Sequence, residues 1–560
     1  MQKVEGMGKV VILIRNLNGK EHLCAYYTAD RPIAPDALKA EISRSLTQYM
    51  VPTAYLQLQA MPMTPNGKTD LKALPEPQLA TTSEYVEAAN STEKTFCNIF
   101  ADILQLQQVG AEDNFFELGG TSLVVTRVII EADKAGLHIS YGDVFANPTP
   151  RKLALLVSGT RQQEDEKDSV KEYDYTAIER VLKLNTLETY IQGEARKLGN
   201  VLVTGATGYL GVHILHHLIS SDAGQIYCLV RGENAHERLA SLLFYYFEDT
   251  YNEMMGKRIH IIRGDVTESL CSLFKDYSID TVFNCAAIVK HFSEGTEIED
   301  INIGGAEKCI ELSLEKGATL VHVSTASTRG LSVNGIPSAE ETFTEKKLYM
   351  GQFLGNKYIW SKFMAERAIL QAVADKGLKA KIMRVGNLAA RSTDGEFQIN
   401  FSTNSFMGRI KVFNMLGCCP YGMMDNKVEF SPINEVSKAI VMLATTPDNC
   451  NVFHPYNNHQ VLLGDMLARL VTIGTEIGFV ETDDFERRME EVKGDPAKAR
   501  QLASLLAYQD MAHGQKTSDV TRDNTYTMQV LYRMGYSWDY TSWDYIDRFL
   551  KAINGMGFFD

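Results

Sequence analysis

The stretch Asn200-Val-Leu-Val-Thr-Gly-Ala-Thr-Gly-Tyr-Leu-Gly211 decides the fold of the larger part of this chain. A short apolar run enters a glycine turn and continues into apolar residues at helical spacing, which predicts a strand over 200–204 and a helix over 209–219. Further strands are expected at 226–231, 259–262, 281–284, 319–324 and 380–384, with helices at 303–315 and 357–373 between them. Such alternation predicts a Rossmann-type, doubly wound parallel α/β sheet.

The glycine turn itself is suited to binding a phosphate group. Glycines let the backbone approach a pyrophosphate closely, and the helix that follows offers free amides and the positive end of its dipole. The spacing is Gly-x-x-Gly-x-x-Gly and not the commoner Gly-x-Gly-x-x-Gly, so a turn of purely structural value is the alternative. The cofactor contacts expected here are Gly205, Thr207, Gly208, Tyr209, Leu210 and Gly211.

The residue after the second strand indicates which dinucleotide would bind. Arg231 stands where a carboxylate would otherwise bond the ribose 2′-hydroxyl, and a guanidinium there favours a 2′-phosphate, hence NADPH over NADH. Arg238 in the next helix can assist, although a solvated helix face is an equally good interpretation of it. Contacts are also expected from the ends of the third and fourth strands, at Asp265, Val266, Ala286 and Ala287.

A tyrosine and a lysine four residues apart give the sharpest catalytic signal. Tyr358 and Lys362 would lie on one face of a helix, where the ammonium can lower the pKa of the phenol and bond the nicotinamide ribose. Thr325, at the end of a preceding strand, supplies a hydroxyl that can orient the same carbonyl. These three residues are predicted to form a general-acid system for hydride addition, with Ser324 and Ser327 as less favoured alternatives to Thr325.

A second motif lies upstream, in Asp113-Asn-Phe-Phe-Glu-Leu-Gly-Gly-Thr-Ser-Leu123. A Gly-Gly turn before Thr-Ser-Leu predicts a helix start at which Ser122 presents an exposed hydroxyl, suited to covalent attachment. Apolar residues at helical spacing around it predict a small four-helix bundle over residues 85–160. Before the bundle, residues 1–76 are predicted to form a small α+β lobe with strands at 9–15, 23–28 and near 54–59, a helix from Pro35, and a glycine loop carrying Lys68.

These assignments predict a multidomain α/β chain of three parts. The third part is expected to span residues 175–560, with a nucleotide-binding core over about 198–400 and a mostly helical substrate subdomain mainly over 400–560. A net charge of −14 over 560 residues argues against nucleic-acid or anionic-membrane partners. No apolar run is long enough for a signal peptide or a membrane span, so a cytoplasmic location is expected. His213, His216 and His217 lack accompanying carboxylates or thiols, and no metal site is predicted.

With these motifs in order, the chain resembles the terminal part of a nonribosomal peptide synthetase. TGATGYLG, STAS, YIWSK and RVGN are similar to an extended short-chain dehydrogenase/reductase of the thioester reductase type, and DNFFELGGTSL resembles a thiolation (peptidyl carrier) domain. Carboxylic acid reductases and aminoadipate reductases are similar in domain order. The resemblance implies a 4′-phosphopantetheine arm on Ser122, added by a phosphopantetheinyl transferase. It also implies NADPH-dependent release of an acyl or peptidyl thioester as an aldehyde, or further to the alcohol. Thr121 departs from the histidine that is frequent in this motif.

The first 76 residues resemble the C-terminal subdomain of an adenylation domain. Lys68 would then be the lysine that contacts the acyl adenylate, but the large ATP-binding subdomain is absent, so Lys68 is expected to be idle and upstream synthetase domains are expected as partners. Two other functions stay open: a sugar-nucleotide epimerase or dehydratase, and a carrier and docking module without catalysis. The acyl substrate is not indicated by the sequence, and a monomer is the default expectation.

Overall fold

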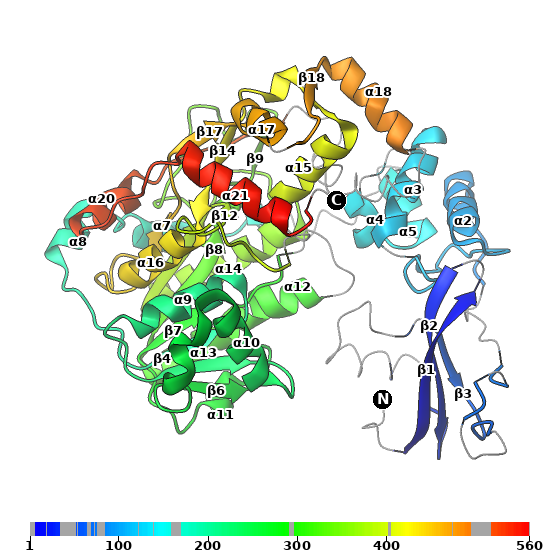
Figure 1. Cartoon of the computed structure of the whole chain (residues 1–560), viewed down its shortest axis with the longest axis horizontal. Helices are drawn as coiled ribbons and strands as arrows, with labels where there is room; N and C mark the ends of the chain where they lie inside the picture. The colour runs from blue at the N-terminus through cyan, green and yellow to red at the C-terminus, as the bar shows by residue number, and fades with distance from the viewer. Residues whose placement is uncertain are drawn as a thin grey trace. The chain divides into compact units, whose positions relative to one another are not determined.

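The computed structural model describes residues 6–17, 20–33, 38, 52, 54–63, 69–71, 73–75, 85–120, 122–137, 139, 141–157, 170–289, 296–400, 405–472, 474–493 and 517–558. The chain divides into two compact units, residues 1–162 and residues 163–560 (Figure 1). The finer division into three parts stays a prediction. Within the described ranges, no helix is both long enough and apolar enough to cross a membrane.

The first unit begins with a three-stranded sheet. Strands β1 (Met7–Leu17) and β2 (Lys20–Ala29) are antiparallel, and β3 (Ala54–Gln57) runs parallel to β2. Alternate residues of β2 face opposite sides, so Cys24 and Tyr26 join one apolar cluster while Tyr27 packs with Leu38 in another. The three predicted strands are therefore present. The helix predicted from Pro35 lies almost wholly outside the described residues.

Among the described residues that follow in the same unit there are four helices: α2 (Ser91–Leu104), α3 (Ser122–Lys134), α4 (Tyr141–Ala146) and α5 (Pro150–Val157). The start of α2 is capped from both directions. The Asn90 side chain accepts from the Glu93 amide at 2.8 Å, and the Glu93 carboxylate accepts from the Ala89 amide at 2.8 Å. The predicted bundle is confirmed.

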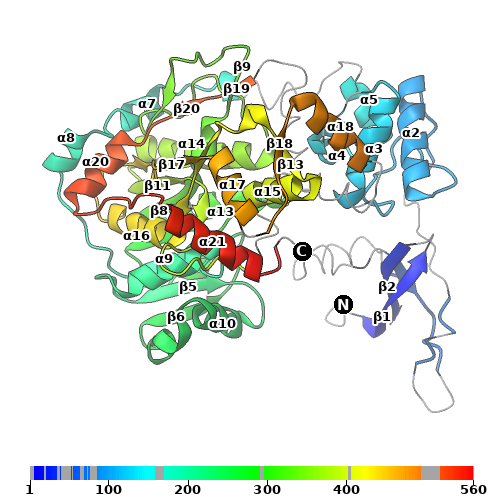
Figure 2. The same ribbon diagram turned by 45° about the horizontal axis from the view of Figure 1, so that its top comes forward.

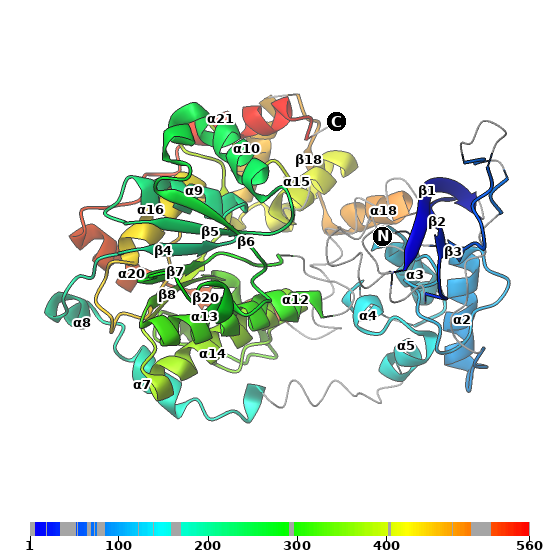
Figure 3. The ribbon, with the colours of Figure 1, turned by 90° about the horizontal axis from the view of Figure 1, so that it is seen from below.

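A seven-stranded parallel sheet forms the centre of the second unit (Figure 3). In spatial order its strands are β16 (Val452–Phe453), β11 (Ala380–Val385), β8 (Thr319–Thr325), β7 (Thr281–Asn284), β4 (Val201–Thr204), β5 (Ile226–Val230) and β6 (Ile259–Arg263). The order reverses between β4 and β7, and in open α/β sheets ligands bind outside the carboxyl ends of the strands at such a switch point.

Helices cover both faces of this sheet, as Figure 3 shows. On one face lie α9 (Tyr209–Ile219), α10 (Ala235–Phe247), α16 (Ile433–Leu443) and α20 (Thr525–Arg533). On the other face lie α7 (Thr176–Leu182), α11 (Leu270–Leu273), α13 (Gly305–Lys316) and α14 (Lys357–Lys376). Strand β4 illustrates the alternation, because Val201 and Val203 belong to the first core and Leu202 to the second.

A second layer of structure from the later part of the chain forms its own core. It contains α15 (Ser405–Leu416), α17 (Leu463–Thr472), α18 (Thr482–Lys493) and α21 (Trp543–Gly555), of which α15, α17 and α21 lie near one another in Figure 2. Short strands accompany them, namely β13 (Cys418–Pro420) with β18 (Gly478–Val480) and β14 (Lys427–Glu429) with β17 (Gln460–Leu462). The predicted helical subdomain is thus present, with short strand pairs that the sequence did not indicate.

Smaller elements connect these layers. The strand pairs are β9 (Leu331–Val333) with β19 (Thr517–Asp519), β10 (Thr342–Phe343) with β20 (Thr521–Arg522), and β12 (Leu388–Ala389) with β15 (Ser431–Pro432). Short helical segments are α8 (Leu187–Gln192), α12 (Glu297–Glu299), η2 (Glu248–Met254), η3 (Asp300–Gly304), η4 (Ala326–Arg329) and η6 (Tyr421–Met423).

The boundary predicted near residue 400 does not end the nucleotide-binding layer. Helices α16 and α20 pack on its sheet and β16 extends it, although all three come from the last third of the chain. The edge strand β16 is held by a side chain from before β4. The Asn185 carboxamide oxygen accepts from the Asn451 and Val452 amides at 2.8 and 3.0 Å. A strand of two residues is too short to give a readable pattern, which is why the sequence did not predict it.

Candidate active site

The glycine turn between β4 and α9 is shaped by close backbone contacts. Gly205 has φ +69°, and a Cβ there would lie 2.6 Å from the Ala286 nitrogen. A Cβ on Gly211 would lie 2.1 Å from the Gly205 carbonyl oxygen. Gly208 caps α9 without a side chain, so the amides of the first helical turn are available to an anion. The turn therefore fits the pyrophosphate of a dinucleotide, and Ala286 lies beside it just after the end of β7.

Two side chains of the turn face away from that cradle. The Tyr209 hydroxyl donates to the Ala389 carbonyl at 3.1 Å, and burial raises the pKa of this phenol well above its ordinary value. Leu210 packs in the core beneath α9. Whatever these two residues contribute to cofactor binding must come through their backbone.

Beyond the turn lie two arginines, Arg231 directly after β5 and Arg238 in the first turn of α10. Arg238 donates to the Arg231 backbone carbonyl at 3.3 Å and to the Thr207 hydroxyl at 3.4 Å, which places the Arg238 guanidinium next to the glycine turn. Arg231 also lies 3.7 Å from the Asp265 carboxylate, and its side chain is 60% exposed, so it can reach a cofactor phosphate. Nothing in the sequence indicated the Arg231–Asp265 pair. Val266 is buried in the core between the sheet and the helices of its other face, which include α11 and α13.

The predicted threonine lies at the carboxyl end of β8. Thr325 is nearly buried, and its hydroxyl oxygen accepts from the Ser327 amide at 3.1 Å where η4 begins. Its neighbour Ser324 points to the opposite face of the strand and donates to the buried Glu366 carboxylate. Ser324 is therefore committed to a structural contact, and Ser327 is exposed outside the strand.

Tyr358 and Lys362 both lie on α14, as the spacing predicts. The Asn356 side chain accepts from the Ile359 amide at 2.9 Å and so starts the helix two residues before the tyrosine. Tyr358 is half-buried, whereas Lys362 is only 2% exposed. The Lys362 ammonium donates to the Val323 carbonyl at 2.6 Å, two residues before Thr325. The structure thereby brings α14 and the end of β8 together at the lysine.

Burial controls the charge of this lysine. Desolvation lowers the pKa of Lys362 from 10.5 to about 8, and the nearby Glu366 and Cys285 act in the opposite direction. Glu366 is itself neutralised by Arg384, whose guanidinium donates to it at 2.7 and 2.9 Å with both side chains fully buried. This ion pair ties α14 to β11. The sequence pointed only to the RVGN motif that contains Arg384, not to its partner.

The attachment motif forms a compact loop ahead of α3. Phe115 packs against Phe100 with ring centroids 4.8 Å apart, and a Cβ on Gly120 would lie 2.4 Å from the Phe115 ring. Gly119 has φ +93°, which favours glycine. The Gly-Gly pair is therefore required by the packing of the loop, and Ser122 is the first residue of α3, as expected. Lys68 and Thr121 lie outside the described residues.

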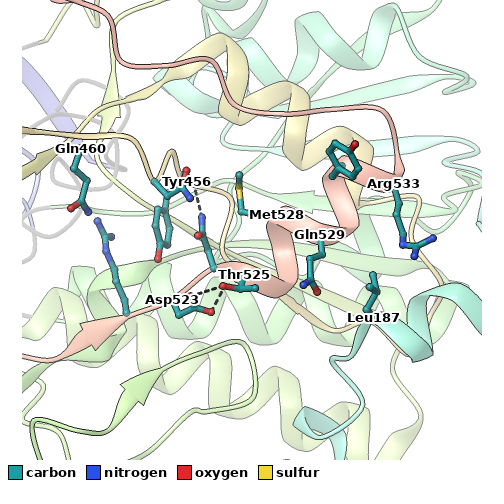
Figure 4. Close-up of a pocket in the computed structure, with 12 residues that line it drawn as sticks. Leu187, Tyr456, Gln460, Asp523, Thr525, Met528, Gln529 and Arg533 are labelled. Atoms are coloured by element: carbon teal, nitrogen blue, oxygen red, sulfur yellow. Dashed lines mark hydrogen bonds between the residues drawn. The ribbon is translucent and has the colours of Figure 1, made fainter.

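A cavity of about 840 Å³ opens elsewhere on the second unit, near α8 and α20 (Figure 4). Its lining comes from three segments and includes Leu187, Tyr456, Arg522, Asp523, Tyr532 and Arg533. Thr525 donates to the Asp523 carboxylate at 2.7 Å within it. No residue predicted to bind the cofactor or to catalyse lines this cavity.

Comparison with known proteins finds two known domain types in this chain. The profile of the family described as "Male sterility protein" matches residues 203–440, and that described as "Phosphopantetheine attachment site" matches residues 94–157. A linear gramicidin synthase of Brevibacillus parabrevis is 28% identical over 90% of this chain, and isonitrile lipopeptide synthase of Mycobacterium tuberculosis is 30% identical over 72%. The chain spans only 10% and 17% of the lengths of these two relatives.

The fold and the matches define a carrier domain followed by an NAD(P)H-binding reductase domain. A solved thiolation-reductase di-domain from an archaeal nonribosomal peptide synthetase is 37% identical, with a TM-score of 0.76, and the match covers 85% of this chain and all of that one. The chain belongs to this family of thiolation–reductase didomains.

Proposed function

We propose that this chain catalyses the NADPH-dependent reductive release of an acyl or peptidyl thioester carried on Ser122, giving an aldehyde. The observation that carries the proposal is the presence in one chain of a carrier helix beginning at Ser122 and a nucleotide-binding sheet with Lys362 buried against the strand that ends at Thr325. A cofactor bound at the glycine turn would supply the hydride, and a phosphopantetheine arm would present the acyl group. Hydride addition would give a thiohemiacetal, whose C–S bond then breaks to release the aldehyde and leave the free thiol on the arm. A second hydride would give the alcohol.

In this proposal three side chains act on the carbonyl oxygen of the substrate. Tyr358 donates the proton that the oxygen acquires, and Thr325 donates a second hydrogen bond that orients it. The Lys362 ammonium favours the ionised form of the phenol after proton transfer and bonds the cofactor ribose. Its low exposure supports this role, because an ammonium acts more strongly on a neighbouring phenol in a dry environment than in water.

The choice of NADPH rests on the arginines beside the turn. Arg231 and Arg238 would bind the 2′-phosphate, and the bond from the Arg238 guanidinium to the Arg231 backbone carbonyl keeps the two residues close together. Asp265 lies close enough to Arg231 to hold it in place. Because the Asp265 carboxylate offsets part of the Arg231 charge, the preference for NADPH over NADH should be smaller than two arginines without a carboxylate partner would give.

Residues before the carrier are proposed to be the end of an adenylation domain whose remainder precedes this chain. Lys68 would have no role without that remainder. The proposed partners are upstream synthetase domains, which would load the arm, and a phosphopantetheinyl transferase, which would install it.

The proposal is tested on the full chain after transfer of acyl-phosphopantetheine from acyl-coenzyme A by a phosphopantetheinyl transferase. We expect oxidation of one NADPH per loaded acyl group and the appearance of an aldehyde. Ser122→Ala should neither load nor oxidise NADPH. Ser91→Ala, at the start of a different carrier helix, is the matched control and should behave like the unmodified chain. Loading without NADPH oxidation across acetyl, fatty-acyl and aminoacyl groups would exclude the proposed reaction.

A further inference from the structure

A line of buried polar side chains crosses the three central strands of the sheet and ends at Lys362. The Thr204 hydroxyl donates to the Asn284 oxygen at 2.8 Å, the Asn284 nitrogen lies 3.1 Å from His322 Nδ1, and His322 Nε2 lies 3.4 Å from the Lys362 nitrogen. The sheet register fixes this line, because Thr204 pairs with Asn284 and Asn284 pairs with His322 on adjacent strands. None of these four side chains is more than 2% exposed.

His322 is neutral in this environment. Burial first, and then the Lys362 ammonium, lower the pKa of the imidazole well below its ordinary value. A neutral imidazole has one nitrogen that donates and one that accepts. The state of the nitrogen that faces Lys362 is therefore coupled to the state of the nitrogen that faces Asn284.

Two hydrogen-bonding states are compatible with these distances. In the orientation that the structure has, the Asn284 oxygen accepts from Thr204 and its nitrogen donates to His322 Nδ1, so that Nε2–H can donate to a neutral lysine amine. With a charged lysine, Nε2 accepts from the ammonium, and a half-turn of the Asn284 carboxamide lets its oxygen accept from Nδ1–H while its nitrogen faces Thr204. The amide can adopt both orientations because its oxygen and nitrogen are nearly equal in shape.

We propose that His322 is a positioning residue for Lys362, holding the lysine side chain against the strand and following its charge by exchange of tautomers with Asn284. This inference rests on the proposed function of Lys362 and goes beyond it. The sequence contains the signal, since a histidine in the apolar strand Thr-Leu-Val-His-Val needs a buried partner.

The other described groups that face Lys362 cannot replace this partner. The Val323 carbonyl accepts only and does not adapt to the charge of the lysine. Burial raises the pKa of the Cys285 thiol to about 12, so it stays neutral where the lysine titrates. Glu366 is held by Arg384, and Tyr358 precedes the lysine by one turn of the same helix. Of these groups, only the imidazole and the Tyr358 hydroxyl can both accept from an ammonium and donate to an amine, and the hydroxyl is assigned above to the substrate carbonyl.

The direct test is 15N NMR of the full chain labelled at histidine. The His322 signals are identified by their loss in His322→Phe. We expect the Nδ1–H tautomer below the pKa of Lys362 and the Nε2–H tautomer above it, with no change of tautomer in Lys362→Met. A single tautomer from about two units below to about two units above that pKa would overturn the inference. This readout does not depend on turnover, so it stands or fails separately from the proposed reaction.

Kinetics give the second test. His322→Phe removes the group that accepts from the Lys362 ammonium. The pH at which kcat is lost on the alkaline side should therefore fall by about one unit. At a pH above the Lys362 pKa of both the unmodified chain and the variant, the variant then has about tenfold less ammonium. His322→Gln keeps an acceptor and should restore most of the profile. His454→Phe is the matched control, because His454 is equally buried but bonds Arg384 and the Asp523 carbonyl. It should lower the melting temperature and leave the profile unchanged. Identical profiles for His322→Phe and His322→Gln would contradict the proposal.

Discussion

Replacing the buried lysine by methionine should change how the stability of the reductase unit depends on pH. In Lys362→Met the side chain keeps an unbranched apolar stem but loses the terminal nitrogen, so it cannot bind a proton. The folded chain has a Lys362 pKa of about 8, against an ordinary value of 10.5 that applies once the chain unfolds. Below pH 8 both states carry the ammonium, and the folded state bears the whole cost of burying it.

Between these two pKa values the folded chain has released the proton and the unfolded chain still holds it. The unfolding free energy of the unmodified chain therefore rises with pH over this interval, relative to Lys362→Met. At about 1.4 kcal/mol for each pKa unit, the rise is about 3 kcal/mol by the upper end of the interval. Catalysis should change in the opposite sense, because the ammonium that the proposed reaction needs is lost above pH 8.

Urea unfolding followed by tryptophan fluorescence measures this difference. The three tryptophans, Trp360, Trp538 and Trp543, all lie in the second unit, so the signal reports the reductase alone. Lys376→Met, at an exposed position in the last turn of the same helix, is the control and should give the same pH dependence as the unmodified chain. A constant or falling difference between the unmodified chain and Lys362→Met would refute the reasoning.

Three further predictions concern the glycines and the arginine. Gly211→Ala places a Cβ 2.1 Å from a backbone oxygen and should abolish NADPH binding measured by fluorescence titration, whereas Gly555→Ala, with free space in α21, should leave it intact. Arg231→Ala should weaken NADPH by about 2 kcal/mol while changing NADH little; an equal loss for both cofactors would contradict the 2′-phosphate assignment. Gly120→Ala places a Cβ against the Phe115 ring and should lower the melting temperature of residues 85–160. It should also slow phosphopantetheine transfer, measured by mass spectrometry, and an unchanged rate of loading would contradict the packing argument.

The central strands could be predicted from the sequence because each is an apolar run bounded by a turn or a helix. Runs such as 200–204 and 319–324 are buried on both faces, and no competing interpretation suits them. The spacing of Tyr358 and Lys362 also predicted that they share a helix. The roles of these residues stay predictions.

What the sequence did not predict depends on register between distant segments. Asn284 meets His322 only because β7 and β8 pair in one particular alignment, and Glu366 meets Arg384 only because α14 crosses β11. The Asp265 partner of Arg231 has the same origin. A polar residue inside an apolar run indicates that it has a buried hydrogen-bonding partner. It does not indicate which residue that partner is.

The carboxamide of Asn185 has a consequence for anyone who wishes to move this reductase into another synthetase. It occupies the place of a neighbouring strand for β16, since it satisfies two backbone amides at the sheet edge. Val170 is buried in the same unit, and Tyr173 bonds Gln371 on α14 at 2.7 Å. A recombinant junction placed just before β4 would strip these contacts and uncover an edge open to intermolecular pairing. A junction ahead of Val170 would keep the unit whole.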